Sequence, residues 1–399
     1  MLTKDAVHYY SIIRDKFKNS YLAEDANQII IGIDCDYIDS HEYSYKTLEL
    51  FYNNQKAIAP FAGLFGIFSY ETIHFFEKIE KKEKSQFEFP QFVFANAKAY
   101  LHYSKISKMY TFYGDEEKYY NFLENESFTE KPAENEFFYK IETDLDKEKE
   151  HFYDIVEKAK EYIKMGDIFQ VVLSEQLCLE SNIDSLEFYK KLAKANPSPY
   201  MFHFPTKYGD VVGSSPEILA EILFNNIYIA PIAGTRPRGK DANEDAFLAQ
   251  DLLNDPKECA EHRMLVDLAR NDIGKFARQG SVIVKNMMHV KHYQHVMHIV
   301  SEVFGQKRND VSLFDIISSV FPAGTLSGAP KIRAMEIIGE LEEYKRNIYG
   351  GGIGFLHFNG NMQLAIVIRS AFFANRNNAT DNISGKNTSE GNNVSKVFI

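Results

Sequence analysis

PIAGTRPRGKDANEDAFLAQDLLNDPKECAEHRMLVDLARND, residues 231–272, is the stretch around which the rest of the chain is organised. A turn-rich segment leads into two expected helices, and the second helix places ionisable side chains between apolar positions. Residues three or four positions apart share one face of a helix. Glu258 and Glu261 therefore project together, and Asp267 and Arg270 have the spacing of an ion pair.

The two glutamates are candidate metal ligands. Adjacent carboxylates repel each other unless a cation lies between them. Their hard oxygens suit Mg2+, which retains some water and often also binds an anionic substrate. The same spacing fits a solvated acidic helix face, and spacing alone does not separate the two interpretations.

The composition is that of a globular protein with a sizeable core, since 45% of its 399 residues are hydrophobic. The net charge of -11 argues against a nucleic-acid partner. The same charge would repel an anionic substrate, so a metal ion or local arginines would have to bind it.

Cysteine usage and hydropathy point to the cytoplasm. The three cysteines form no CxxC pair, which is typical of reduced thiols in a cytosolic protein. The N-terminus lacks the apolar run of a signal peptide, and no apolar run approaches membrane-spanning length. We therefore expect a cytoplasmic protein with no membrane partner.

The sequence divides into four regions by composition and pattern. Residues 1–113 are expected to form an N-terminal α+β region, and residues 114–147 an acidic linker. Residues 148–373 hold the motifs described below and form the expected catalytic domain. Residues 374–399 combine a polar low-complexity tail with the start of a further strand.

Two apolar runs contain polar residues that need a partner. Asp167–Leu179 is predicted to be one strand, and Gln170 within it is costly to bury unless its amide is hydrogen-bonded. Gln363–Phe373 is predicted to be the second strand of a hairpin. Arg369 within it needs an anionic partner, which a ligand carboxylate would provide.

A group of histidines is a weaker candidate site. Residues 282–303 contain His289, His292, His295 and His298. Metal binding is the tempting interpretation, but the segment lacks a compact set of cysteine or carboxylate ligands, which argues against it.

Several long motifs in order resemble those of the chorismate-binding enzymes, and within them the large subunits of anthranilate synthases. The resemblance covers residues 167–373 and, more weakly, residues 63–71. The motifs are DIFQVVLS, NPSPYMF, GSSPE, PIAGTRPRG, EHRMLVDLARND, VMHIVS, GTLSGAPKIRAMEII, YGGGIGF and AIVIRSAFF.

The resemblance implies a fold and a reaction. The fold is an α+β architecture of two packed antiparallel β-sheets flanked by helices. The reaction is the Mg2+-dependent addition of ammonia to chorismate with elimination of pyruvate, which gives anthranilate, the first committed step of tryptophan biosynthesis. A separate glutamine amidotransferase subunit supplies the ammonia.

The resemblance also assigns roles, residue by residue. Glu217 matches a general acid that helps the ring hydroxyl leave, and His298 matches the histidine of the pyruvate-eliminating step. Thr325 lies at the pocket. The metal ligands are Glu261 and Glu258, and the substrate-binding residues are Tyr349, Arg369, Gly350 and Gly351.

Two positions separate this chain from relatives with other products. Water-adding isochorismate synthases have a lysine where this chain has Gln170, which cannot act as a base toward water. Aminodeoxychorismate synthases often have a nucleophilic lysine where this chain has Ala233. Aminodeoxychorismate synthase therefore remains an alternative that Ala233 disfavours.

Two departures from the family pattern lead to further expectations. The family continues with a glycine motif and a second metal-binding glutamate, whereas this chain ends at Ile399. We therefore expect a truncated chain, inactive or nearly so by itself. A non-catalytic chain that binds its partner subunit and a fragment completed by a separate polypeptide both remain open.

The second departure concerns tryptophan, the feedback inhibitor of many members. Tyr21–Asp25 replaces their LLES-like motif, whereas Asn196–Met201 is intact. Weakened or absent inhibition is the expectation. The candidate tryptophan-site residues are Pro199, Tyr200 and Met201.

Overall fold

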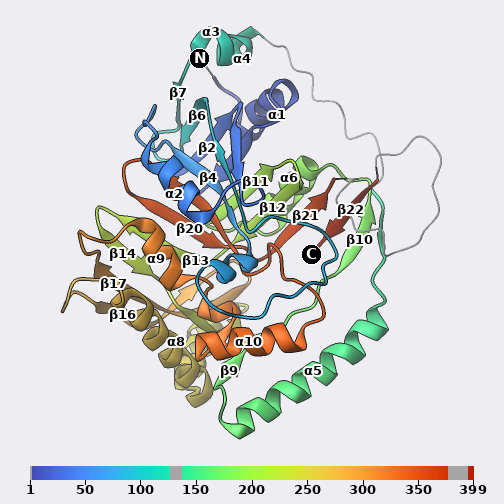
Figure 1. Ribbon diagram of the computed structural model, residues 1–399, viewed down its shortest axis with the longest axis vertical. Helices are drawn as coiled ribbons and strands as arrows, with labels where there is room; N and C mark the ends of the chain where they lie inside the picture. Colours follow the sequence, from blue (N-terminus) through green and yellow to red (C-terminus); the bar gives the residue numbers. More distant parts are fainter. Residues whose placement is uncertain (1, 126–136, 376–393) are drawn as a thin grey trace.

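Two ten-stranded antiparallel sheets pack against each other and are flanked by helices (Figure 1). The computed structural model describes residues 2–125, 137–375 and 394–399. This architecture confirms the predicted fold class. None of the helices within these ranges combines the length and the apolar content needed to cross a membrane.

The first sheet has the strand order β7-β6-β2-β1-β11-β12-β21-β22-β10-β8. Every neighbouring pair in it is antiparallel. Its strands are β1 (Tyr21–Glu24), β2 (Gln28–Ile33), β6 (Ala99–Ser104), β7 (Met109–Tyr113), β8 (Tyr139–Ile141), β10 (Cys178–Ser181), β11 (Tyr200–Pro205), β12 (Gly209–Ser215), β21 (Ser370–Ala374) and β22 (Ser395–Phe398).

The second sheet has the order β15-β17-β14-β13-β20-β19-β4-β5-β3, and β16 pairs with β17. A separate two-stranded sheet joins β18 to β9. These strands are β3 (Asp36–Asp39), β4 (Gly63–Phe68), β5 (Phe92–Asn96), β13 (Ile218–Leu223), β14 (Asn226–Ile229), β15 (Ile232–Pro237), β16 (Ile283–His292), β17 (Val296–Gln306), β19 (Gly352–His357) and β20 (Met362–Ile366), with β9 (Gln170–Val171) and β18 (Gly328–Ala329) in the small sheet.

Helices cover the outer faces of the two sheets. Figure 1 shows α8 and α10 at the opposite end of the molecule from α1. The helices are α1 (Ala6–Lys16), α2 (Tyr45–Asn53), α3 (Glu116–Tyr119), α4 (Asn121–Asn125), α5 (Leu145–Met165), α6 (Ser185–Ala195), α7 (Ala242–Asn254), α8 (Pro256–Gly274), α9 (Leu313–Val320) and α10 (Lys331–Leu341), with short 3₁₀ helices η1 (Tyr70–Phe75) and η2 (Gly324–Leu326).

Aromatic side chains fill the space between the sheets. Phe65 of the second sheet stacks on Tyr21 of the first with ring centroids 4.4 Å apart, and it meets the edge of Phe204 at 5.3 Å. All three side chains are buried. Burial of large apolar rings is the main favourable term in such a core.

Both sheets contain strands from residues 1–113 and from residues 148–373. The N-terminal strands β1 and β2 continue the first sheet beyond β11, and β3, β4 and β5 continue the second sheet beyond β19. The division of the sequence into an N-terminal region and a catalytic domain remains a prediction from the sequence.

The prediction of one strand over Asp167–Leu179 was wrong. Only Gln170–Val171 and Cys178–Ser181 are strands, and the segment between them bonds to a buried ion pair. Glu342 accepts hydrogen bonds from Ser174 N and Oγ, and Arg346 donates to the Val172 carbonyl. Side chains thus satisfy the Val172 carbonyl and Ser174 N, while Val172 N and Leu177 N bond to the carbonyls of Ser327 and Ile399.

The prediction of one strand over Gln363–Phe373 was also wrong. The chain leaves the second sheet after Ile366 and enters the first sheet at Ser370. Arg369 lies in this crossing with φ 52, in the left-handed region. Its charge is therefore not held within a strand, and its side chain is exposed.

The ends of the predicted linker and tail are ordered as strands and short helices. Residues 114–125 contain α3 and α4, and β8 follows at Tyr139–Ile141. At the other end, β22 lies between β21 and β10 with Val397 and Phe398 buried. The rest of both predictions, residues 126–136 and 376–393, lies outside the described residues.

Candidate active site

Two crossings between the sheets bring Glu217 and Arg369 together. Glu217 lies between β12 of the first sheet and β13 of the second, and Arg369 lies between β20 and β21. The two crossings run side by side because β12 pairs with β21 and β13 pairs with β20. Backbone hydrogen bonds join them, from Ile366 N to the Glu217 carbonyl and from Ser214 N to the Arg369 carbonyl.

Glu217 is a buried carboxyl group that favours its protonated form. Thr325 Oγ1 donates to its Oε1 at 2.9 Å. Burial raises the pKa of Glu217 from 4.5 to about 7, against the smaller lowering effects of Thr325 and of the Arg369 charge. A carboxyl group with a pKa near neutrality is suited to general acid catalysis.

His298 is held as a neutral base beside the same arginine. Its Nδ1 lies 3.1 Å from the Gly234 carbonyl and 3.0 Å from Thr235 Oγ1. A carbonyl oxygen only accepts, so Nδ1 carries the proton and Nε2 is the basic nitrogen. Burial lowers the pKa of His298, and the charge of Arg369 adds to this effect.

A bulge in β15 positions the Gly234 carbonyl that His298 contacts. The register of β15 against β17 shifts between Ala233 and Thr235, and Gly234 has φ 75. A side chain there would be strained, and its Cβ would lie 3.1 Å from Glu258 Oε2. Gly234 therefore lies between the imidazole of His298 and the carboxylate of Glu258.

Sequence analysis missed Tyr293. Its ring meets the edge of the His298 ring at 5.4 Å. Burial raises the pKa of Tyr293 to about 12, with Glu217 raising it and Arg369 lowering it. Arg238 fixes the turn that carries Tyr293, since its side chain donates to the Tyr293 carbonyl at 2.7 Å. The sequence offered no motif for this tyrosine.

Arg236 and Arg238 are committed to protein carboxylates. Arg236 pairs with Asp251 at 2.7 Å and with Asp255, the N-cap of α8, at 2.9 Å. Arg238 pairs with Asp245. Arg236 therefore links β15 to α7 and α8, and Arg238 links the end of β15 to α7. Both guanidinium groups are already paired with protein carboxylates.

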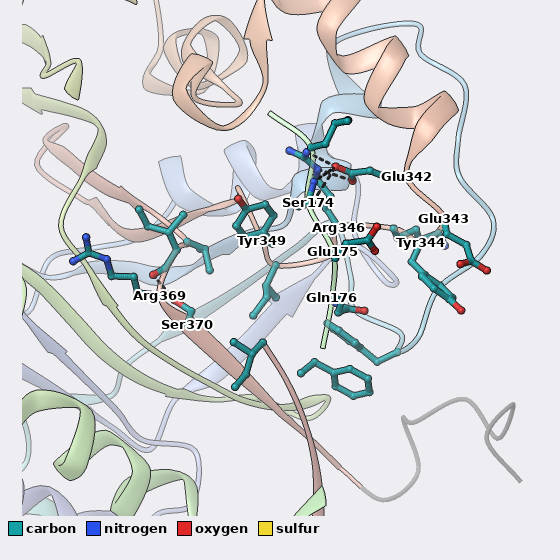
Figure 2. Close-up of a pocket in the computed structure, with 18 of the residues that line it drawn as sticks. Ser174, Glu175, Gln176, Glu342, Glu343, Tyr344, Arg346, Tyr349, Arg369 and Ser370 are labelled. Carbon is teal, nitrogen blue, oxygen red and sulfur yellow. Dashed lines mark hydrogen bonds and ion pairs between the residues drawn. The ribbon is translucent and has the colours of Figure 1, made fainter. Parts of the chain in front are cut away.

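Arg369 and Tyr349 line one cavity of about 470 Å³ (Figure 2). Tyr349 lies between Arg369 and the buried Arg346–Glu342 ion pair in this view. Among the described residues, Arg369 has no ion-pair partner. Its guanidinium is therefore free to bind an anionic ligand, and Figure 2 shows it directed away from Tyr349.

The predicted glycines shape this wall. Gly350 has φ 72, and its N–H bonds to the Val367 carbonyl. A Cβ on Gly351 would lie 2.3 Å from the Phe68 carbonyl. Neither position tolerates a side chain, so the backbone passes close to the crossing that carries Arg369.

Glu258 and Glu261 lie one turn apart on α8, as predicted. The helix starts at Pro256, and the Asp255 side chain caps the N–H groups of Lys257 and Glu258. The expected Asp267–Arg270 ion pair is confirmed at 2.7 Å. Among the described residues, neither glutamate has an ion pair with a lysine or arginine. Two half-buried, unneutralised carboxylates are suitable ligands for Mg2+, with water completing the shell.

Gln170 orients one of these glutamates. Its Nε2 donates to Glu261 Oε1 at 2.8 Å, whereas its Oε1 is buried without a hydrogen-bond partner among the described residues. The strand β9 also pairs with β18 (Gly328–Ala329). β18 follows η2, the short helix that contains Thr325. The strand pair therefore links the acid at Glu217, through Thr325, to the carboxylates of α8.

Two of the predicted tryptophan-site residues line a separate, smaller cavity. Tyr200 and Met201 line a cavity of about 30 Å³ together with Ala23, Glu24 and Asp25. The pairing of β1 with β11 places Glu24 opposite Met201. The structure thus brings together the altered segment and the intact one, whereas Pro199 precedes β11 and does not line this cavity.

Comparisons of sequence identify relatives of the chain. It is 54% identical over 224 residues to anthranilate synthase component 1 of Acetivibrio thermocellus, covering 56% of this chain and 45% of that protein. It is 42% identical over 308 residues to anthranilate synthase component 1 of Methanothermobacter marburgensis, covering 77% of this chain and 66% of that protein. The matches thus span 45% and 66% of the two relatives' lengths.

Solved structures share the fold. Anthranilate synthase component I from Streptococcus pneumoniae matches with a TM-score of 0.72 at 29% identity, over 93% of this chain and 86% of that chain. MenF, the menaquinone-specific isochorismate synthase from Escherichia coli, also gives a TM-score of 0.72, over 100% of this chain and 85% of that chain. Its identity is 14%, which shows a common fold alone.

The family assignment rests on the sequence as a whole. The pattern of the family described as chorismate binding enzyme matches residues 9–381. This match includes Glu217 and Arg369 at the two crossings between the sheets, Glu261 on α8 and His298 on β17. The chain belongs to the chorismate-binding enzyme family.

Proposed function

We propose that the chain catalyses the amination of chorismate by ammonia, followed by elimination of pyruvate to give anthranilate. The observation that carries the proposal is the hydrogen bond from Thr325 to the buried carboxyl group of Glu217, together with the charge of Arg369, which lowers the pKa of both Glu217 and His298. Two titratable groups whose environments favour opposite roles are the usual signature of an acid and a base.

Each residue has one task in this reaction. Glu217 gives its proton to the ring hydroxyl, which leaves as water while ammonia adds to the ring. His298 Nε2 then takes the ring proton at the carbon that bears nitrogen, and the enolpyruvyl group leaves as pyruvate. The atoms balance, because chorismate and ammonia become anthranilate, pyruvate and water.

The charged groups of chorismate need two cationic sites. Arg369, with the Tyr349 hydroxyl, would bind the enolpyruvyl carboxylate. Mg2+ held by Glu258 and Glu261 would neutralise the ring carboxylate. The strand pair between Gln170 and Ala329 supports this arrangement, because it ties the metal ligands to the loop of Thr325.

Ammonia rather than water is the proposed nucleophile. The side-chain amide of Gln170 donates to Glu261, and it has no basic nitrogen that could activate water. Ala233 lies buried in β15 and offers no amine for a covalent route. We also propose that a glutamine amidotransferase subunit supplies the ammonia and that the complex is cytoplasmic, in keeping with three free cysteines.

Product identification tests the proposal. The purified chain, and a version extended by the glycine motif and second metal-binding glutamate of the family pattern, are each incubated with chorismate, ammonium and Mg2+, and anthranilate is followed by its fluorescence and confirmed by mass. Because the chain alone is expected to be inactive or nearly so, product is expected from the extended version, which is used in the activity assays below. Glu261→Gln should abolish product, whereas Asp267→Asn, a matched change on the exposed part of α8, should not. Isochorismate or 4-aminobenzoate as the main product would overturn the proposed reaction.

A further inference from the structure

A second group of metal-ligand side chains lies outside the candidate active site. Glu148 and His151 project from the first turns of α5, and Glu175 lies between β9 and β10. One ligand atom from each residue lies within 4.8 Å of the others. His151 Nδ1 is 2.8 Å from Glu175 Oε1.

Among the described residues the two carboxylates have no lysine or arginine partner, and His151 pairs with Glu175 as a cation only when its ring is protonated. Other carboxylates on α5 pair with lysines of the same helix: Asp154 with Lys158, Glu157 with Lys160, and Glu161 with Lys164. Neither Glu148 nor Glu175 has an ion pair with a lysine or arginine of the described chain. Two carboxylates held together without such a partner leave a negative site that a cation would satisfy.

Both elements that carry the group are held in place. The Asp144 side chain caps the start of α5, and residues three apart on a helix share a face. The residue before Glu175 is fixed by two hydrogen bonds from Ser174 to Glu342, whose carboxylate pairs with the buried Arg346. Figure 2 shows Ser174 and Glu175 on one segment beside this ion pair.

The spacing is close to that of a coordination shell. Ligand atoms about 2.1 Å from a tetrahedral metal lie about 3.4 Å apart. The 2.8 Å separation of His151 and Glu175 therefore has to open by only about half an ångström. Glu175 lines the cavity of about 470 Å³, which gives an ion and its water ligands a path to the site.

We propose that Glu148, His151 and Glu175 bind one divalent transition-metal ion of the Zn2+ class. An imidazole nitrogen beside two carboxylate oxygens suits Zn2+, Mn2+ or Co2+ better than Mg2+, which prefers oxygen ligands alone. The bound ion ties α5 to the segment between β9 and β10, at the wall of the cavity that also holds Tyr349. The proposal does not depend on the reaction proposed for the chain.

Calorimetric titration with Zn2+ tests the site in the full chain. Glu261→Gln serves as the background that removes binding at α8. We expect this variant to bind one Zn2+ per chain, and we expect about 10 mM Mg2+ to leave the affinity for Zn2+ unchanged. His151→Ala and Glu175→Gln should each weaken binding by about tenfold or more. Glu157→Gln, on the same helix, and His8→Ala are the matched controls and should bind as before.

Thermal unfolding separates metal binding from folding. Zn2+ should raise the Tm of the Glu261→Gln chain and leave the Tm of its His151→Ala derivative unchanged. If His151→Ala does not fold, His151→Gln keeps a hydrogen-bonding side chain and replaces it. The proposal is overturned if the chain binds no Zn2+, if it binds Zn2+ equally without His151, or if Mg2+ displaces Zn2+ at equal concentration.

Discussion

Thr325 Oγ1 donates a hydrogen bond to Glu217 Oε1 at 2.9 Å, although the two residues are 108 positions apart in the chain. The bond joins the crossing between β12 and β13 to the loop that follows α9. It fixes one oxygen of a buried carboxyl group and leaves the other available to a substrate. Glu217 is therefore oriented, and burial raises its pKa to about 7.

Glu217→Gln should lower the rate of anthranilate formation by about 10²–10⁴-fold, the usual contribution of a general acid. The amide keeps the hydrogen bond from Thr325 but has no proton of suitable acidity to give. Binding of chorismate, measured by calorimetry, should change little. A variant with an undiminished rate would show that another group supplies the proton.

The rate should also report the pKa of the acid. Burial raises the pKa of Glu217 to about 7, and the protonated form is the active one. The rate constant for amination should therefore fall as pH rises through about 7. Single-turnover measurements across this range provide the test, and a rate that rises with pH throughout would contradict the role.

The same shift predicts a pH-dependent stability. The folded pKa of Glu217 is raised, so the stabilisation is fully present below the ordinary value of 4.5 and is lost as pH rises through about 7. The full effect is about 3 kcal/mol from the size of the shift. Relative to Glu217→Gln, the native chain should lose free energy of unfolding between pH 5 and pH 8. Denaturant unfolding at both pH values measures the difference, and a constant difference would count against the buried acid.

Gln170→Met should weaken the response to Mg2+. The substitution removes the hydrogen bond to Glu261 Oε1 and leaves the carboxylate free to turn. Groups that orient metal ligands typically change affinity by about 10–100-fold when they are removed. The Mg2+ concentration for half-maximal rate should rise accordingly, with Gln250→Met on α7 as the control. An unchanged Mg2+ response would place the metal elsewhere.

Tryptophan should bind weakly or not at all. The cavity between the altered β1 segment and Met201 measures about 30 Å³, far below the roughly 300 Å³ of a typical ligand pocket. Glu24 at its edge is also engaged, by Lys105 at 2.6 Å and Tyr189 at 2.9 Å. Calorimetry with tryptophan should show no saturable binding in the micromolar range, and tight binding would refute this prediction.

The sequence predicted the elements better than the contacts between them. The helix with Glu258 and Glu261 follows from local spacing and a capping residue, both of which act within one turn. By contrast, the Gln170–Glu261 bond spans 91 positions, and no local pattern specifies it. Pairing across such distances depends on how the strands of two sheets are ordered.

The crossing at Arg369 shows why the path of the chain between the two sheets could not be predicted from the sequence. The apolar run continues through it because the strands on both sides are buried, although they belong to different sheets. The positive φ falls on an arginine rather than on the glycine or asparagine that usually marks such a position. The resemblance supplied the role of Arg369, but its backbone conformation could be learned only from the structure.

The central claim is that Glu217 is the acid of the amination step and His298 is the base of the pyruvate-eliminating step. Rapid quench with mass detection, applied to the native chain, Glu217→Gln and His298→Met with chorismate, ammonia and Mg2+, tests it most directly. We predict that His298→Met accumulates an aminated intermediate that still bears the pyruvyl group, while Glu217→Gln forms neither intermediate nor anthranilate. Anthranilate released by His298→Met at the native rate, or the intermediate accumulating in Glu217→Gln instead, would contradict it.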